Sequence, residues 1–389
     1  MSMRDHGGWR AAVGAVVIAS LSGCGSSVTV FGGGGGGAGE GGEAPSACDW
    51  EARPLVRVTA DPEGMSPELR GSPDGTVALV YPRDGAIWLS RWGWHEAVPV
   101  AGAPWVDDSW GMVAGGDAER VAVIVRDETG SLVLHEEGQA TVTLPLPDGA
   151  TVHWLGAPDA TGARALVFSR DEPPVQIIWG SGGSWSAPID FGCRRRVAEE
   201  RGLFASYCSE PHAIRLRSSQ AEIVSEVRLR EELHSPEHFA DLRLLPRDGE
   251  RWLLWTDGQD GDVYDSLTDV RSWLQPLDPE GVPRGEVVEL PLSPWYGAAA
   301  SLGDRVALVG SRAVQAWNVV IVDEVGAVRE ELSLPGEAPG EISVYLDEPS
   351  LVAQDDVILV AWRDDQGVAV QGFDCVPRSG SAGGEDAGL

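Results

Sequence analysis

The sequence predicts an all-β protein, and within that class a single seven-bladed β-propeller. Three observations lead to this prediction. A motif that consists of a turn followed by an apolar run recurs along the chain, its copies are evenly spaced, and one unpaired strand precedes the first copy. The composition agrees, since 50 glycines and 26 prolines separate short apolar runs over 389 residues. Short apolar runs bounded by turn residues are typical of antiparallel sheets.

The clearest copy of this motif occupies residues 72–90. The turn Ser72-Pro73-Asp74-Gly75 precedes an apolar run at residues 77–81, and a second turn leads into residues 87–90. Proline fixes one backbone angle of a turn, aspartate bonds to the backbone ahead of it, and glycine accepts a positive φ. Residues 72–90 are therefore predicted to form two adjacent antiparallel strands.

Seven such turns precede seven apolar runs. From Asp74 in the first turn to Asp356 in the last, six intervals span 282 residues, which gives a mean period of 47 residues. This period suits a propeller blade, which contains four short strands and their turns. Six or eight blades are the alternatives, because the fourth and fifth units are the least regular. The expected buried strands are residues 77–81, 121–125, 165–168, 203–207, 252–255, 306–309 and 357–362.

The seventh unit lacks a fourth strand, because the chain after Val376 is a tail of Gly, Ser and Glu. Residues 51–60 form an extra strand before the first unit, and we expect this strand to complete the seventh blade, with Pro54 on its solvent side. The propeller is thus predicted over residues 48–376, followed by a disordered tail at 377–389.

The cysteines support a closed ring. Cys193 and Cys208 flank a predicted turn at residues 199–202, so they are expected to face each other across a hairpin within disulfide reach. Cys48 begins the closing strand and Cys375 ends the strand with which it should pair. We predict a disulfide between the members of each pair, because an exported protein meets an oxidising compartment.

The N-terminus predicts an export signal. Arg4 and Arg10 accompany an apolar run at residues 11–19 that is too short to span a bilayer, and Leu21-Ser22-Gly23-Cys24 follows. This tetrapeptide resembles the lipobox of bacterial lipoproteins. The resemblance implies that residues 1–23 are a signal peptide and that Cys24 carries a lipid, which would hold the protein to a bilayer of the bacterial cell envelope, facing the periplasm or the surface.

Residues 24–47 follow this signal and are rich in glycine, with Gly32 to Gly37 unbroken. Such a composition predicts a flexible linker with a root-mean-square reach of roughly 25 Å. The propeller is therefore expected to stand off the membrane.

The repeat itself resembles a known family. Ser72-Pro73-Asp74-Gly75-Thr76 with its apolar run resembles the blades of TolB-type propellers, and the fifth unit, with Trp255-Thr256-Asp257, resembles the repeats of large secreted bacterial propellers. The resemblance implies the fold and an exported location. It implies no catalytic residue, because these repeats are structural.

The charge excludes several classes of function. The formal net charge is −31, which disfavours nucleic acids and anionic lipid surfaces as partners. All 29 basic residues are arginine, so Schiff-base chemistry and phosphate loops that need lysine are excluded. The local signatures of serine hydrolases, zinc proteases and dithiol enzymes are also missing from the sequence.

One face of a propeller collects the turns between second and third strands and the connections between blades. Here these turns contain Arg-Asp pairs, at Arg83-Asp84, Arg126-Asp127, Arg170-Asp171 and Arg363-Asp364, and the connections add His153, Trp154, His234 and His238. Aromatic side chains among charges suit a protein or glycan partner. The binding residues we propose are Trp92, Trp94, Trp105, Asp107, Asp108, Trp110, Trp295 and Tyr296. The alternative is that the charged pairs form solvated turns and that the tryptophans, Trp88 among them, pack between blades.

Metal binding has one candidate. Asp257, Asp260, Asp262 and Asp265, with Asp269 nearby, could hold Ca²⁺, which prefers oxygen ligands, although their spacing departs from the usual calcium loop and a solvated acidic loop is the default. His234 and His238 are separated by Pro236, which argues against a helix that would align them on zinc. No other cofactor is expected.

The leading hypothesis is an envelope lipoprotein whose propeller binds a protein or glycan without catalysis. One alternative is a carbohydrate-active enzyme, a glycoside hydrolase or lyase, that uses carboxylates in the central funnel. The other is a structural subunit of an envelope complex.

Overall fold

A computed structural model describes most of the chain after residue 47. The described residues are 48–58, 66–72, 74–91, 97–104, 113–116, 118–127, 129–158, 163–170, 176–181, 184–191, 193, 197–200, 202–208, 211–229, 239–247, 249–258, 270–290, 298–313, 316–335, 349–354, 356–364 and 366–377. They all fall within one compact unit, Ala38–Leu389. They contain strands and turns without a helix, and hence no helix that could span a membrane.

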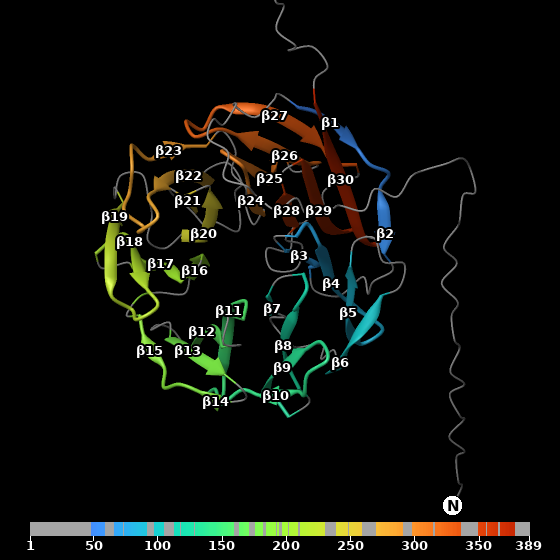
Figure 1. Ribbon diagram of the computed structural model, residues 1–389, viewed down its shortest axis with the longest axis vertical. Helices are drawn as coiled ribbons and strands as arrows, with labels where there is room; N and C mark the ends of the chain where they lie inside the picture. The colour runs from blue at the N-terminus through green and yellow to red at the C-terminus, as the bar shows by residue number, and fades with distance from the viewer. Residues whose placement is uncertain are drawn as a thin grey trace, which may run out of the picture. The chain divides into compact units, whose positions relative to one another are not determined.

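These strands form seven antiparallel sheets arranged in a ring (Figure 1), so the seven-bladed propeller is confirmed. In six of the sheets the first strand in the chain lies nearest the common axis and the last lies outermost, whereas in the seventh the two N-terminal strands lie outermost. The first three blades contain, in order, β3 (Glu68–Gly71), β4 (Val77–Arg83), β5 (Ala86–Arg91) and β6 (Val98–Pro104); β7 (Val113–Gly115), β8 (Ala122–Arg126), β9 (Leu132–Glu136) and β10 (Val142–Thr143); and β11 (Ala150–Leu155), β12 (Arg164–Arg170), β13 (Gln176–Ser181), β14 (Ser184–Trp185) and β15 (Ile189–Asp190).

The remaining blades follow the same plan. They contain β16 (Val197–Glu200), β17 (Leu203–Cys208), β18 (Ala213–Ser218) and β19 (Ile223–Arg228); β20 (Phe239–Arg247), β21 (Glu250–Gly258), β22 (Val270–Leu277) and β23 (Val288–Glu289); β24 (Ala299–Leu302), β25 (Arg305–Ala313), β26 (Ala316–Val322) and β27 (Val328–Ser333); and β28 (Ser350–Gln354), β29 (Val357–Asp364) and β30 (Gly367–Pro377), completed by β1 (Cys48–Ala52) and β2 (Val56–Val58).

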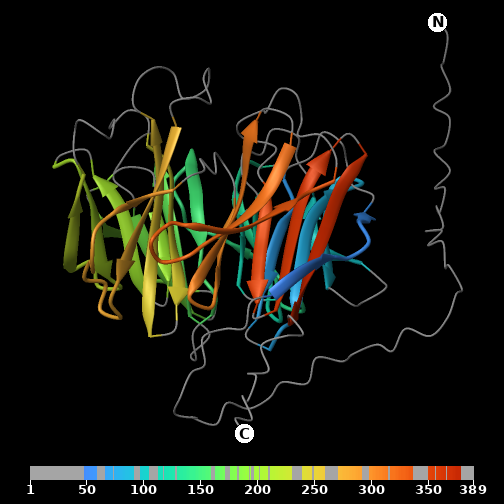
Figure 2. The ribbon, with the colours of Figure 1, turned by 90° about the horizontal axis from the view of Figure 1, so that it is seen from above.

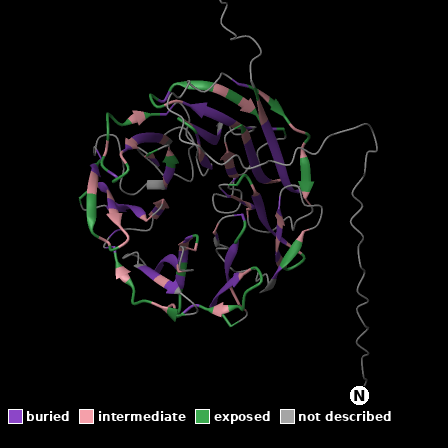
Figure 3. Ribbon diagram, in the orientation of Figure 1, coloured by how far each residue is buried: buried purple, intermediate pink, exposed green. Residues whose placement is uncertain are grey.

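Hydrophobic packing between neighbouring blades holds the ring together. Each of the seven buried clusters joins two consecutive blades, and one of them joins the seventh blade to the first. In β4, Val77 and Leu79 pack toward the seventh blade while Ala78 and Val80 pack toward the second. Second strands are thus buried on both faces, which explains why their sequences are continuous apolar runs. Figure 3 shows the contrast between these buried strands and the exposed outer rim.

The N-terminal segment closes the ring as predicted, with one correction. We expected one continuous strand at residues 51–60, but the structure has β1 and β2, both paired with β30 and separated by residues 53–55. The exposed Pro54 lies in this break, because proline has no backbone N–H to donate to the ladder. Arg53 keeps the break attached to β30, since its backbone N–H donates to Gly372 O at 2.9 Å and its side chain forms an ion pair with Asp374.

Both predicted disulfides are confirmed. Cys48 is bonded to Cys375 and Cys193 to Cys208, with Cα atoms 5.1 and 4.7 Å apart. The hairpin between β16 and β17 pairs Glu200 with Leu203, however, so its centre lies one residue later than the cysteines' symmetry suggested. Cys193 precedes β16, so the second disulfide joins the end of β17 to a residue outside the paired strands rather than to a directly opposed one.

A second kind of turn was missed in the sequence. Three hairpins carry Asp-x-x-Gly, beginning at Asp127, Asp278 and Asp323, and in each the glycine N–H donates to the aspartate carbonyl at 2.9 to 3.0 Å. The three glycines have φ values between +73° and +88°, which only glycine adopts without strain. Each aspartate carboxylate also accepts bonds from backbone N–H groups of its own turn. These turns fix hairpin register in blades where the apolar pattern is weak.

The strands run between two faces of the ring, as the side view shows (Figure 2). At the face that we call the connection face, second strands end, third strands begin, and fourth strands lead to the next blade. The opposite face, the turn face, holds the turns between first and second and between third and fourth strands. The two longest connections, residues 259–269 and 334–349, leave from the connection face. Cys48 lies at the turn face, because it pairs with Pro377 at the far end of β30.

Candidate functional site

The described residues of the Arg-Asp pairs lie on the connection face, as predicted. Arg83, Arg126 and Arg170 each end a second strand, and Arg363-Asp364 ends β29. In the first blade the Arg83 side chain donates to Asp84 at 3.1 Å, and its guanidinium carbon lies 4.7 Å from the ring centroid of Trp88. The Trp88 indole N–H in turn donates to the Arg83 carbonyl at 2.8 Å. This turn therefore satisfies its own polar groups.

Two other pairs connect neighbouring parts of the ring. Arg126 donates to the carbonyl of Gly130 at 2.6 Å and to that of Ala150, in the next blade, at 2.9 Å. The hydroxyl and backbone of Thr129 bond to Asp127 and hold the pKa of its carboxyl below the usual range. Asp364 accepts two bonds from Arg57 of the closing strand, at 2.8 and 2.6 Å. In these pairs the charged side chains stabilise turns and contacts between blades. This favours the alternative that the Arg-Asp pairs have a structural role rather than a role in binding a partner.

The expectation that His153 and Trp154 lie in a connection between blades is wrong, because both belong to an innermost strand and have structural roles there. Both lie on β11, where His153 Nε2 is 2.6 Å from the hydroxyl of Ser169. The Trp154 ring meets the edge of Phe204 in the next blade, with centroids 5.8 Å apart. The expectation that a tryptophan packs between blades is confirmed for Trp154.

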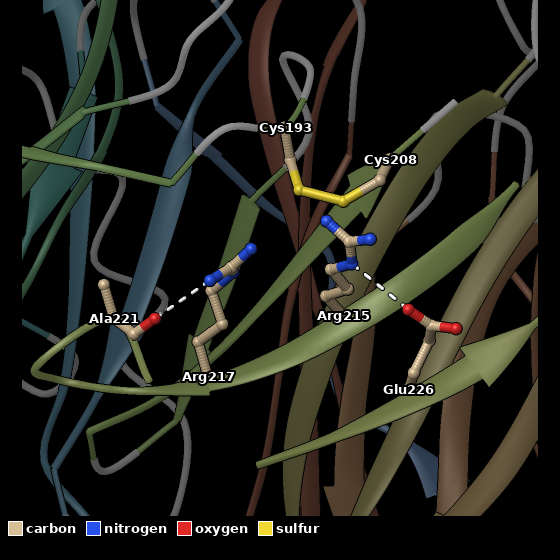
Figure 4. The surroundings of a disulfide bond; sticks show 6 residues. All are labelled: Cys193, Cys208, Arg215, Arg217, Ala221 and Glu226. Carbon is tan, nitrogen blue, oxygen red and sulfur yellow. Dashed lines mark hydrogen bonds and ion pairs between the residues drawn. A yellow bond between two sulfur atoms is a disulfide. The ribbon is translucent and has the colours of Figure 1, made fainter. Parts of the chain in front are cut away.

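The junction of the third and fourth blades gathers arginines around the Cys193–Cys208 disulfide (Figure 4). Arg215 donates to Glu226 at 3.1 Å, and Arg217 donates to the Ala221 carbonyl at 2.9 Å. Burial lowers the pKa of Arg217, and the nearby positive charge of Arg215 adds to this effect. Sequence reasoning missed this junction, although eight of the 29 arginines fall within residues 194–230.

A half-buried acid lies on the innermost strand of the same blade. Burial raises the pKa of Glu199 from 4.5 to about 7, opposed by a bond from the Gly202 N–H at 2.5 Å and aided by the neighbouring charge of Glu200. Among the residues that the structure describes, this is the one carboxyl whose pKa is raised. A carboxyl with a pKa near neutrality can both donate and accept a proton at physiological pH.

The substitution Glu199→Gln is expected to stabilise the protein in a pH-dependent way. Folded Glu199 keeps a proton that the unfolded chain releases between its ordinary pKa of 4.5 and about 7, so the native protein loses stability as the pH rises through this window. Glutamine cannot ionise. The stability gain should grow from about 1 kcal/mol at pH 5 to about 3 kcal/mol at pH 8 in urea unfolding. Glu200→Gln is the control, and a gain that is equal at both pH values would contradict the burial of Glu199.

Comparison with solved structures identifies the architecture. The chain resembles selenomethionine-substituted virginiamycin B lyase from Staphylococcus aureus with a TM-score of 0.51 and 11% identity, over 84% of this chain and 100% of that chain. It also resembles BBS1N in complex with ARL6DN, with a TM-score of 0.51 and 12% identity, over 85% and 98% of the two chains. The chain has the β-propeller fold. At such identities the similarity shows the fold alone.

Sequence comparison adds no family. No protein-family model matches this chain, and no curated protein matches its sequence. The functional inference therefore rests on the propeller's own residues.

All eight of the aromatic and acidic residues proposed for binding lie outside the described residues. Two chain segments that contain them join strands whose described ends are on the connection face: residues 105–112 hold Trp105, Asp107, Asp108 and Trp110, and residues 291–297 hold Trp295 and Tyr296. Residues 92–96, with Trp92 and Trp94, instead join β5 to β6, whose adjoining ends are on the turn face. The two sets therefore belong to segments of opposite faces. His234, His238 and Asp171 are likewise outside the described residues.

The calcium site stays a prediction. Asp257 lies near the end of β21, and its side chain, like Asp260, Asp262, Asp265 and Asp269, is outside the described residues. The part of the chain that is described contains no group of three or more residues that could hold a metal ion.

Proposed function

We propose that this protein is a bacterial envelope lipoprotein whose propeller binds a protein or glycan partner at its connection face without catalysing a reaction. The observation that carries the proposal is the difference in connection length between the two faces. The two longest connections, with further ones of eight to ten residues, leave from the connection face, whereas the turn face has one connection of such length, residues 278–287. Loops carried by a rigid scaffold are where proteins most often place binding residues.

The proposed lipid anchor agrees with binding at the connection face. The lipid would be carried by Cys24 and the linker would reach the propeller at Cys48, which lies on the turn face. A protein held from that side presents its connection face away from the point of attachment. A partner would then reach the connection face from the periplasm or the cell exterior, depending on the membrane that carries the lipid.

The residues of the connections suggest the chemistry of the partner. Trp105, Trp110, Trp295 and Tyr296 supply large amphipathic side chains, and Asp107 supplies an acceptor for hydrogen bonds. Such side chains dominate binding to proteins and to sugars. BBS1N, which shares the fold, is solved in complex with the protein ARL6DN, so a propeller of this kind can serve as a protein-binding module.

Affinity capture from detergent-solubilised envelopes tests the proposal. The lipidated protein is compared with a Trp105→Ala, Trp295→Ala variant that melts at the same temperature, and with a Trp92→Ala, Trp94→Ala variant as the control from the opposite set. We expect a stoichiometric partner that the first variant loses and the control retains. Equal capture by all three proteins would contradict binding at the connection face, and a partner that never dissociates would favour a structural subunit instead.

A carbohydrate-active enzyme is the second candidate, and Glu199 is the observation that favours it. This acid lies on an innermost strand and has a pKa of about 7, as a general acid requires. Glycosidases generally need two carboxyl groups flanking the substrate, and the described residues supply one with a raised pKa. Turnover of an envelope polysaccharide that Glu199→Gln abolishes, with the fold intact, would establish the enzyme.

A further inference from the structure

A second surface stands out on the turn face. The described residues expose nine large hydrophobic side chains, and eight of them lie at strand ends or turns of that face. Six of the eight come from three consecutive blades, the fourth, fifth and sixth, with exposed fractions from 37% for Val328 to 64% for Val325. We call these six the apolar rim: Ile223, Val224, Val282, Val287, Val325 and Val328.

Direct contacts hold the three parts of the apolar rim next to one another. The Ser225 hydroxyl of β19 donates to the carbonyl of Gly281, which precedes Val282 in the fifth blade. Gly326, next to Val325, packs so closely on the fifth blade that an added Cβ would lie 2.4 Å from Val288 Cγ1. The outer parts of the three blades are thus neighbours, and exposed apolar side chains gathered on neighbouring elements are typical of interaction sites.

The apolar rim is surrounded by negative charge. Residues 219–224, 278–290 and 323–329 contain seven acidic and two basic side chains. Both basic side chains are paired, Arg284 with Glu250 at 3.2 Å and Arg329 with Asp323. Two of the acidic side chains pair with arginines from elsewhere, Glu324 with Arg247 at 2.9 Å and Glu289 with Arg271 at 3.7 Å. With these partners counted, acidic side chains still outnumber basic ones. A partner for this surface must therefore offer apolar side chains together with positive charge.

The backbone beside the apolar rim favours an extended partner. β19 is the outermost strand of its sheet, with six residues, and it is paired on one side only among the described strands. A free strand edge can accept a further strand through main-chain hydrogen bonds, with alternate side chains giving specificity.

We propose that the apolar rim binds an extended basic, apolar segment of a partner protein. A second copy of this chain would bring the same acidic surface and be repelled, and an anionic bilayer would be repelled in the same way. This binding site is distinct from the connection face and does not depend on the function proposed for that face.

Fluorescence anisotropy with a defined probe tests the inference. The probe is a labelled seven-residue peptide of alternating lysine and valine, titrated with the lipidated protein in detergent. We expect the Val287→Ser, Val325→Ser variant to weaken binding at least tenfold. The control, Val98→Ser, Val376→Ser, removes two exposed valines from other blades of the same face and should bind like the parent. A peptide with glutamate in place of lysine should not bind.

Equal binding by the two variants, or binding of the glutamate peptide, would overturn the proposal. Two further outcomes would assign the apolar rim to another occupant and overturn it as well. One is self-association in sedimentation that Val287→Ser, Val325→Ser abolishes. The other is flotation of protein lacking the lipid with phosphatidylcholine vesicles that depends on the same two valines.

Discussion

Replacing Cys48 and Cys375 together by serine is expected to lower the free energy of unfolding by about 4 to 5 kcal/mol. The bond joins residues 327 positions apart, so it restricts almost the whole unfolded propeller. It also fixes β1 against β30, which completes the seventh blade. Guanidinium unfolding of the oxidised parent and the variant measures the loss.

The other disulfide provides the comparison. Cys193 and Cys208 are 15 positions apart, so their replacement by serine is expected to cost about 3 kcal/mol. A larger loss from this pair than from Cys48 and Cys375 would show that the N-terminal strand contributes little to closing the ring.

The substitution Trp252→Ala is expected to destabilise the protein by about 3 to 5 kcal/mol. Trp252 is fully buried in the cluster between the fifth and sixth blades, and the Arg247 guanidinium carbon lies 4.5 Å from its ring centroid. Alanine would leave a cavity at a blade interface and remove the cation–π contact.

Urea unfolding of Trp252→Ala and Trp252→Phe separates the two effects. Phenylalanine keeps an aromatic ring and most of the volume, so its cost should be less than half of that of alanine. A loss below 1 kcal/mol for Trp252→Ala would contradict the account of blade interfaces as the main source of stability.

The architecture could be predicted because its strongest signals are local. Second strands such as β4 are buried on both faces, so they must be continuous apolar runs, and the turn before each run has recognisable residues. The outer strands carry weaker signals because they are exposed. β10, β14, β15 and β23 have two residues each, and their positions follow from hairpin turns such as Asp278-x-x-Gly281 rather than from an apolar pattern.

The candidate site was less predictable, because its residues take their roles from neighbouring blades. Nothing near Arg126 in the sequence indicates that it bonds to Ala150 of the next blade, or near Trp154 that it packs on Phe204. Burial of Glu199 likewise depends on tertiary packing, so its raised pKa had no sequence signal. Sequence reasoning placed the Arg-Asp turns at the correct face, but it could not distinguish residues that bind a partner from residues that stabilise neighbouring blades.

Cross-linking through a single introduced lysine tests the central proposal most directly. The chain has no lysine, and the proposed acylation of the amino terminus at Cys24 would leave no other free amine. An amine-reactive cross-linker applied to intact cells can therefore couple this protein only through the introduced lysine. Gln366→Lys places it on the exposed β29–β30 turn of the connection face, and Gln139→Lys places it on the exposed β9–β10 turn of the turn face. We predict a cross-linked partner with Gln366→Lys and none with Gln139→Lys. The same adduct from both variants, or an adduct from Gln139→Lys alone, would contradict binding at the connection face.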